Sequence, residues 1–243
     1  MHYFASDIHL GAGDAAEARA TEQRFVAWLD RVAADAETIV LLGDIFDFWF
    51  EYRRVVPQGF VRTLGKLAEL SDRGIRILFL TGNHDMWMAD YLVRECGVEL
   101  YTTPQVLLLE GKRLFVAHGD NMKIDGQWLL KLMNTTFRSR PVRWLFSWLV
   151  HPDWAVRFGR WWSGSSRKRH ARSTLTETVT EPLIAYAREY QTTATEPIDA
   201  FIFGHMHFPR CFDEGALHTL HLGCWEEGES YAQLDKAGRL TLN

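Results

Sequence analysis

The chain has 243 residues and a mass of 28.1 kDa, enough for one large domain. Hydrophobic residues make up 47% of it, which allows a large core and excludes a disordered chain. The formal net charge of −4 gives no basic signature of nucleic-acid binding, so nucleic acid is not predicted as a partner. Three cysteines without metal-site spacing favour a reducing compartment. Neither a signal peptide nor a transmembrane run is recognisable, so we expect a cytoplasmic protein.

Strands and helices alternate in the first part of the chain. Apolar residues recur at helical spacing in two segments and form short, mostly apolar runs in three others. The predicted order is a strand at 2–6, a helix at 17–34, a strand at 38–42, a helix at 58–73 and a strand at 75–80. This alternation predicts an α/β fold in which helices cover the sheet, with ligands at the carboxyl ends of its strands.

The second part of the chain is rich in strands but contains one long interruption. A hairpin is predicted at 106–117, and further strands at 200–203, 217–222, 230–234 and 239–242. The segment between the hairpin and these strands is mostly helical by pattern. We therefore predict a core formed by residues 1–120 and 197–243, with residues 121–196 as an inserted helical lid.

Five short motifs carry the chemistry, and nearly all of them follow a predicted strand. They are Asp7-Ile8-His9, Gly43-Asp44-Ile45-Phe46-Asp47, Gly82-Asn83-His84-Asp85, His118-Gly119-Asp120 and Gly204-His205-Met206-His207. Asp7 and His9 are two residues apart, and an extended segment would place both side chains on one face. Asp44 offers two oxygens that could bridge two ions, and Asn83 offers a carbonyl oxygen. The motifs therefore predict a centre for two metal ions that activates water for attack on phosphorus.

The donor set of this predicted centre mixes oxygen with imidazole nitrogen. Such a mixture suits Mn²⁺, Fe²⁺, Zn²⁺ or Co²⁺ better than Ca²⁺, and Mn²⁺ is our first choice for the two divalent ions. Any one of the motifs alone could be an ordinary turn. A binding module on an inactive scaffold is the alternative from another class, but it would be expected to have lost ligands, and none is missing from the sequence.

With these motifs in this order, the chain resembles the calcineurin-like metallophosphoesterase superfamily over residues 1–120 and 197–243. The resemblance implies a four-layer α/β/β/α sandwich. It also implies that His84 contacts phosphate or protonates the leaving group while Asp85 orients its imidazole. The implied first metal ion has the ligands Asp7, His9, Asp44 and His207, and the implied second ion has Asp44, Asn83, His118 and His205.

The predicted lid is basic and aromatic, unlike the rest of the chain. Residues 138–172 hold nine lysines and arginines, five tryptophans and a single acid, Asp153. Trp144 and Trp148 share one helical face, and Trp154 and Phe158 share another further along. Three interpretations remain open: packing of the lid onto the core, contact with an anionic membrane surface, or an acyl-chain pocket below a basic rim.

Within the superfamily, the chain is similar to the UDP-2,3-diacylglucosamine pyrophosphatases of lipid A biosynthesis. The similarity rests on the segments 6–11, 43–49, 118–125 and 222–231 and on the position of the insertion. It implies hydrolysis of a UDP-linked diacylated glucosamine lipid by a peripheral protein on the cytoplasmic face of the inner membrane. The implied substrate-binding residues are Asn83, Asp125, Arg167, Lys168 and Arg169. A phosphodiesterase or phosphomonoesterase acting on a soluble nucleotide is the alternative enzyme.

Overall fold

The first of two sheets contains the parallel strands predicted in the N-terminal part. The computed structural model describes residues 1–122, 135–136, 139–159, 163–164, 181–226 and 228–243. Within them, this sheet has the order β11–β10–β1–β2–β3–β4, and β1 to β4 run parallel. Its strands are β1 (His2–Ala5), β2 (Thr38–Leu42), β3 (Arg76–Leu80), β4 (Glu99–Tyr101), β10 (Tyr231–Leu234) and β11 (Leu240–Leu242).

The second sheet is built from the later strands, in the order β5–β6–β7–β9–β8. Its three central strands are parallel, and an antiparallel strand lies at each edge. The members are β5 (Gln105–Leu109), β6 (Lys112–Ala117), β7 (Ala200–Phe203), β8 (Pro209–Glu214) and β9 (Leu217–Leu222). Parallel strands in both sheets mean that each sheet presents several carboxyl ends at one edge.

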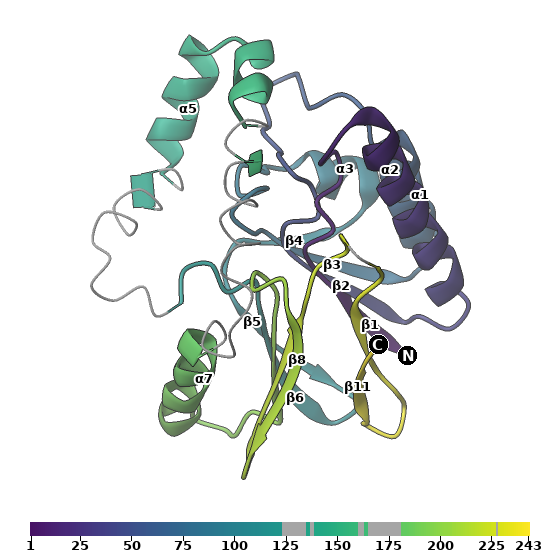
Figure 1. Cartoon of the computed structure of the whole chain (residues 1–243), viewed down its shortest axis with the longest axis vertical. Coiled ribbons are helices and arrows are strands. Elements are labelled where there is room, and N and C mark those ends of the chain that lie inside the picture. The colour runs from purple at the N-terminus through teal and green to yellow at the C-terminus, as the bar shows by residue number, and fades with distance from the viewer. Residues whose placement is uncertain (123–134, 137–138, 160–162, 165–180, 227) are drawn as a thin grey trace.

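Three apolar clusters hold the sheets and helices in four layers (Figure 1). Trp28 of α1 (Ala15–Val32) and Leu67 of α2 (Val61–Asp72) pack on the outer face of the first sheet, beside α3 (Tyr91–Cys96). Val40 and Val116 belong to the cluster between the sheets. Leu183 of α7 (Glu181–Thr193) packs on the outer face of the second sheet. The predicted α/β/β/α sandwich is therefore confirmed.

Helices α5 and α7 both fall in the range 121–196, but they occupy different places. Helix α7 supplies the fourth layer of the sandwich, whereas α5 (Arg140–Leu149) stands away from both sheets (Figure 1). Arg143 of α5 donates to the backbone carbonyls of Trp87 and Met88 at 3.2 and 3.0 Å. The ring of Phe146 also packs against the Trp87 ring, with 5.0 Å between their centres. No helix in the described ranges is long and apolar enough to cross a bilayer.

A buried histidine in β9 should make stability depend on pH. His221 is fully buried, neither ring nitrogen has a hydrogen-bond partner among the described residues, and burial lowers its pKa to about 4. The unfolded chain takes up this proton near the ordinary pKa of about 6.5, so stability is lost as pH falls from about 6.5 towards 4. Because His221→Phe has no imidazole here, its free energy of unfolding should fall by up to about 3 kcal/mol less than that of wild type over this pH range.

This prediction is checked by urea unfolding of both proteins at several pH values between 4 and 7.5. The free-energy difference between them should move in favour of His221→Phe as the pH falls. The site histidines titrate in both proteins and therefore cancel in the difference. His218→Phe, on the same strand but exposed, is the matched control. Parallel pH curves for wild type and His221→Phe would show that the buried imidazole does not titrate as inferred.

Candidate dimetal centre

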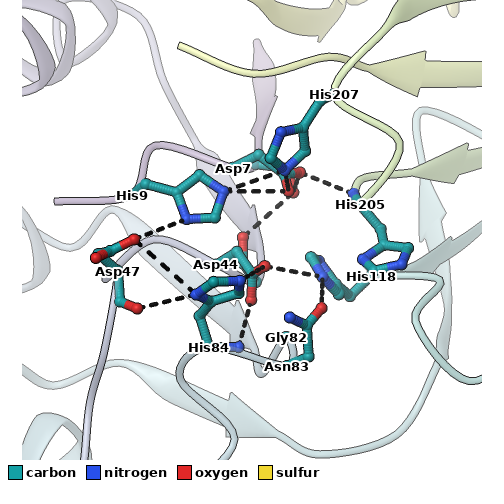
Figure 2. A network of polar contacts seen from close by, with 12 residues as sticks. Asp7, His9, Asp44, Asp47, Gly82, Asn83, His84, His118, His205 and His207 are labelled. Carbon is teal, nitrogen blue, oxygen red and sulfur yellow. Dashed lines mark hydrogen bonds and ion pairs between the residues drawn. The ribbon is translucent and has the colours of Figure 1, made fainter. Parts of the chain in front are cut away.

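The seven predicted ligands lie on loops that follow five parallel strands, and the loops converge at one place between the two sheets (Figure 2). They are Asp7 and His9 after β1, Asp44 after β2, Asn83 after β3, His118 after β6, and His205 and His207 after β7. Residues separated by up to 200 positions in the sequence thus meet because the carboxyl ends of the strands meet.

Five of these seven residues have a left-handed backbone, which residues other than glycine rarely adopt. Their φ angles are 54° for Asp7, 51° for His9, 52° for Asp44, 67° for His205 and 50° for His207. Each such residue costs of order 1–2 kcal/mol, so the surrounding structure has to hold it in place. Backbone strain of this kind is common at functional sites, and here the strained conformations direct the side chains towards the ligand cluster.

The predicted extended segment around Asp7 and His9 is wrong. Strand β1 ends at Ala5, and both later residues have positive φ. The loop after β1 instead runs alongside the loop after β2 and pairs with it. Asp7 N donates to Gly43 O at 3.1 Å, and His9 N donates to Asp44 O at 3.0 Å. The two side chains still reach a common point (Figure 2), through the pairing of two loops rather than through strand alternation.

Two glycines allow the loops after β2 and β3 to come this close. A Cβ atom on Gly43 would lie 2.5 Å from the nitrogen of Gly82, and one on Gly82 would lie 2.2 Å from Oδ1 of Asp44. Either methyl group would force the loops apart. The glycines of the Gly-Asp and Gly-Asn motifs are therefore needed for close packing around Asp44.

One group of ligand atoms comprises Asp7, His9 and His207. Nε2 of His207 lies 3.2 Å from Oδ1 of Asp7 and 3.2 Å from Nε2 of His9. Atoms bound to one ion at about 2.1 Å lie roughly 3 Å apart, so these three side chains fit a single cation.

A second group comprises Asp44, His118 and His205, whose ligand atoms all lie within 4.8 Å of one another. Asn83 belongs with them, since its Oδ1 lies 3.1 Å from Nε2 of His118. The opposite nitrogen of His118 is 2.8 Å from the carbonyl oxygen of Leu42, to which it donates as Nδ1–H. This bond leaves Nε2 facing the site, where it could bind a metal ion once its own proton is released.

Asp44 connects the two groups, as predicted for a bridging carboxylate. Its Oδ2 lies 3.4 Å from Nε2 of His118 in the second group. It also forms a candidate cluster with His9 of the first group and with His84. Asp44 is almost completely buried, so a cation beside it would be poorly screened by water.

The carboxylates hold protons on two of the imidazoles. Burial alone would lower the pKa of His207, but the Asp7 carboxylate and Cys224 raise it to about 11. Burial would likewise lower the pKa of His118, but the Asp44 carboxylate raises it to about 10. Divalent cations would supply the positive charge that these protons provide. We therefore expect metal binding to release protons near neutral pH.

Two other imidazoles are already in the form that binds metal. Burial lowers the pKa of His9 to about 3 and that of His205 to about 4. Both side chains are therefore neutral at pH 7 and have a lone pair available. The donor set, its spacing and its charge all fit a pair of divalent ions.

Comparison with known proteins agrees with this geometry. The family model for calcineurin-like phosphoesterases matches residues 3–209. The chain belongs to this family. Its relatives include the UDP-2,3-diacylglucosamine hydrolase of Porphyromonas gingivalis, 39% identical over 96% of this chain and 93% of the relative. The UDP-2,3-diacylglucosamine hydrolase of Ralstonia nicotianae is 31% identical over 92% of this chain and 83% of the relative. The family uses divalent metal ions, for which the clusters above are the candidate ligands.

His84 of this calcineurin-like phosphoesterase lies at the edge of the ligand cluster, with one nitrogen occupied. Its Nδ1 donates to the backbone carbonyl of Asp47 at 2.9 Å, and its peptide nitrogen donates to Oδ1 of Asp44 at 2.8 Å. Nε2 lies 3.8 Å from Oδ2 of Asp44, beyond hydrogen-bond distance. The ring therefore has a fixed orientation and a second nitrogen available to a phosphate.

Asp85 does not orient His84, contrary to the sequence-based expectation. Its two carboxylate oxygens accept hydrogen bonds from the backbone nitrogens of Ile45 at 2.9 Å and Gly82 at 2.7 Å. Burial raises the pKa of this carboxyl group to about 7, and Asp44 raises it as well. Asp85 thus holds the loops after β2 and β3 together, and the carbonyl of Asp47 orients the imidazole.

Two residues for which no role was predicted support the site. Asp47 accepts a hydrogen bond from the hydroxyl of Ser163 and has Oδ1 3.7 Å from Nδ1 of His9. Ser6 donates to Oδ2 of Asp7 at 2.6 Å. In the sequence, Asp47 stands in the Gly-Asp-x-x-Asp segment and Ser6 in the Ser-Asp-x-His segment, and these positions could have identified them as site residues. Both tie the ligand loops to their surroundings.

An apolar pocket adjoins His84, Asn83 and Asp47. Its walls come from two parts of the chain, the loops after β2 and β3 and the described part of the predicted lid. The apolar members are Phe48, Trp49, Met86, Trp87, Phe146 and Phe158. A ligand with a hydrophobic arm could therefore place that arm here while its polar part meets the ligand cluster.

The remaining predicted substrate residues, Asp125, Arg167, Lys168 and Arg169, lie outside the described residues. Asn83 is placed both among the ligand atoms and in the wall of the apolar pocket.

Proposed function

We propose that the protein hydrolyses the pyrophosphate bond of UDP-2,3-diacylglucosamine to UMP and 2,3-diacylglucosamine 1-phosphate. The observation that carries this proposal is the 39% identity to a UDP-2,3-diacylglucosamine hydrolase over nearly the whole of both chains. Water adds to the α-phosphorus of the substrate, and the bond from that phosphorus to the bridging oxygen breaks. The lipid phosphate leaves with the bridging oxygen.

The protein would hold two divalent ions in this reaction, Mn²⁺ being the ion we propose first. Asp7, His9 and His207 would bind one of them, His118 and His205 the other, with Asp44 between them and Asn83 beside the second. When bound, such ions supply Lewis-acid charge and lower the pKa of a water molecule.

The chain's own residues position the substrate's two phosphates. His84 directs Nε2 towards the ligand cluster from the wall of the apolar pocket. The lipid phosphate departs on this side if the acyl chains occupy that pocket. His84 would then donate a hydrogen bond to the leaving phosphate as negative charge develops on it.

The apolar pocket supports the lipid substrate over a soluble nucleotide. Phe158 lies in its wall and is 50% exposed, and Phe146 packs against Trp87 from α5. A nucleotide without acyl chains would leave this apolar surface facing water. Acyl chains would remove it from water, at roughly 25 cal/mol per Å².

The test is UMP release from UDP-2,3-diacylglucosamine with added Mn²⁺, beside UDP-N-acetylglucosamine as a soluble substrate and an aryl phosphodiester. Hydrolysis of the lipid substrate at least about 100-fold more efficient than that of the soluble one is expected, because the pocket is apolar. Equal hydrolysis of the two nucleotides would overturn the lipid assignment and favour the soluble-nucleotide alternative. Failure to hydrolyse any of the three would favour an inactive binding module.

We further propose that the insertion meets the inner membrane. Trp144, Trp148, Leu149 and Trp154 are 62%, 74%, 73% and 74% exposed, so a large apolar face of the described insertion has no cover within the described residues. The surrounding segment 138–172 is strongly basic. Tryptophan with arginine suits the headgroup region of an anionic bilayer.

Trp148→Glu should therefore weaken binding to phosphatidylglycerol vesicles by at least about tenfold, because a buried Trp contributes a few kcal/mol and a carboxylate is repelled. Vesicle co-sedimentation measures this partitioning. Val61→Glu is the matched control, since Val61 is 76% exposed on α2 in another part of the fold. Equal binding by wild type and both variants would contradict the membrane proposal.

A further inference from the structure

A second cavity adjoins the ligand cluster and shares no lining residue with the apolar pocket. Its walls come from the ends of β3 and β6, the loop between β4 and β5, and α7. It reaches the cluster at His118, whereas the apolar pocket reaches it at Asn83. These two side chains are 3.1 Å apart, so the cavities meet the cluster at neighbouring ligands.

The walls of the second cavity include more polar side chains than those of the first. They include the hydroxyls of Thr81, Thr102 and Thr103, the carboxylate of Asp120 and the amide of Asn121. Thr102, Thr103 and Asn121 are exposed and so can be reached by a ligand. Apolar surface is also present, from Pro104, Met122 and the ring of Tyr186.

Thr81 adds an independent observation. It is 5% exposed, lines the cavity, and its hydroxyl has no hydrogen-bond partner within the described part of the chain. A buried hydroxyl without a partner costs of the order of 1–3 kcal/mol. Thr81 therefore places an unsatisfied polar group in the wall of this cavity.

We propose that this second cavity binds the nucleoside of the substrate, a pyrimidine ring and its ribose. The inference rests on the proposed function, in which the substrate has one polar and one lipid arm joined by a diphosphate. Hydroxyl and amide groups match the alternating acceptors and donor of a uracil ring, and a carboxylate matches a ribose diol. Pro104 and Tyr186 offer apolar surface to the ring faces.

The polarity of the two cavities sets the direction in which the substrate lies. With the nucleoside beside His118 and the acyl chains beside His84, the diphosphate spans the ligand cluster. The α-phosphorus then lies on the His118 side, and the leaving lipid phosphate lies on the His84 side. This is the orientation that the proposed role of His84 requires.

The test uses Thr102→Trp to fill the cavity and Thr102→Val to remove only the hydroxyl, with Thr192→Trp on the exposed end of α7 as the control. Inhibition by UMP is compared with inhibition by inorganic phosphate, using an aryl phosphodiester as the substrate. UMP should inhibit wild type more strongly than phosphate does. Thr102→Trp should weaken UMP inhibition by at least about tenfold while changing phosphate inhibition by less than about twofold.

The outcomes separate this inference from the proposed function. A wild-type enzyme that does not release UMP from the lipid substrate overturns the proposed function. If UMP release occurs but UMP inhibition is the same in wild type and Thr102→Trp, the nucleoside site lies elsewhere and the inference fails. If the tryptophan lowers aryl turnover, Thr102→Val decides, and an unchanged ratio of UMP to phosphate inhibition in that variant overturns the inference.

Discussion

Replacing Asp44 with asparagine should reduce metal-dependent phosphodiester hydrolysis by at least about 10³-fold, a loss of roughly 4 kcal/mol of transition-state stabilisation. The amide can still accept the hydrogen bond from the His84 backbone, which Asp44 receives at Oδ1. It cannot supply the negative charge that Oδ2 presents to His118 and to the two groups of ligand atoms on either side. The effect should therefore come from metal binding rather than from misfolding.

Metal analysis of the purified proteins, beside turnover of an aryl phosphodiester under saturating Mn²⁺, checks this prediction. The variant should bind less than the two ions of wild type, and its thermal unfolding in chelator should remain cooperative. Asp30→Asn is the control, because Asp30 is exposed and pairs with Lys66 at 2.7 Å on the surface. A variant that keeps both ions and more than about a tenth of the activity would show that Asp44 does not bridge the centre.

The arrangement of most strands and helices could be predicted because their apolar residues follow the period of the element that buries them. The predicted strands at 38–42, 200–203 and 217–222 agree with β2, β7 and β9 to the residue. Helix α3 and strand β4 were missed, since six and three residues are too short for a period to show. Strand β8 was missed because it starts at a proline and is largely exposed at a sheet edge.

The composition of the candidate site could be predicted better than its geometry. Residue type and position after a strand were enough to identify the seven expected ligand residues, which the fold brings together. The left-handed backbone of Asp7 and the pairing of its loop with Gly43 could not be predicted, because they depend on contacts between distant segments. For the same reason the neighbouring Asp85 was expected to orient His84, although the backbone carbonyl of Asp47 does so. A backbone carbonyl leaves no signal in residue type.

His84→Gln should lower kcat by about 10²-fold or more while leaving the metal content of the protein unchanged. His84 forms a candidate metal cluster with His9 and Asp44, so a role as a ligand is the competing interpretation. Against it, Nδ1 is occupied by the Asp47 carbonyl at 2.9 Å, and Nε2 is 3.8 Å from the nearest Asp44 oxygen. His84 also borders the apolar pocket, where the leaving phosphate is expected.

Metal analysis and steady-state kinetics on the same samples distinguish the two roles. A residue that binds the leaving phosphate should affect kcat more than metal content, because its contact strengthens as negative charge develops in the transition state. His218→Gln, an exposed histidine on β9, should leave both quantities unchanged. If His84→Gln instead loses one of two ions, and excess Mn²⁺ restores kcat, then His84 is a metal ligand. In that case the stabilisation of the leaving group has to come from another side chain at the mouth of the apolar pocket.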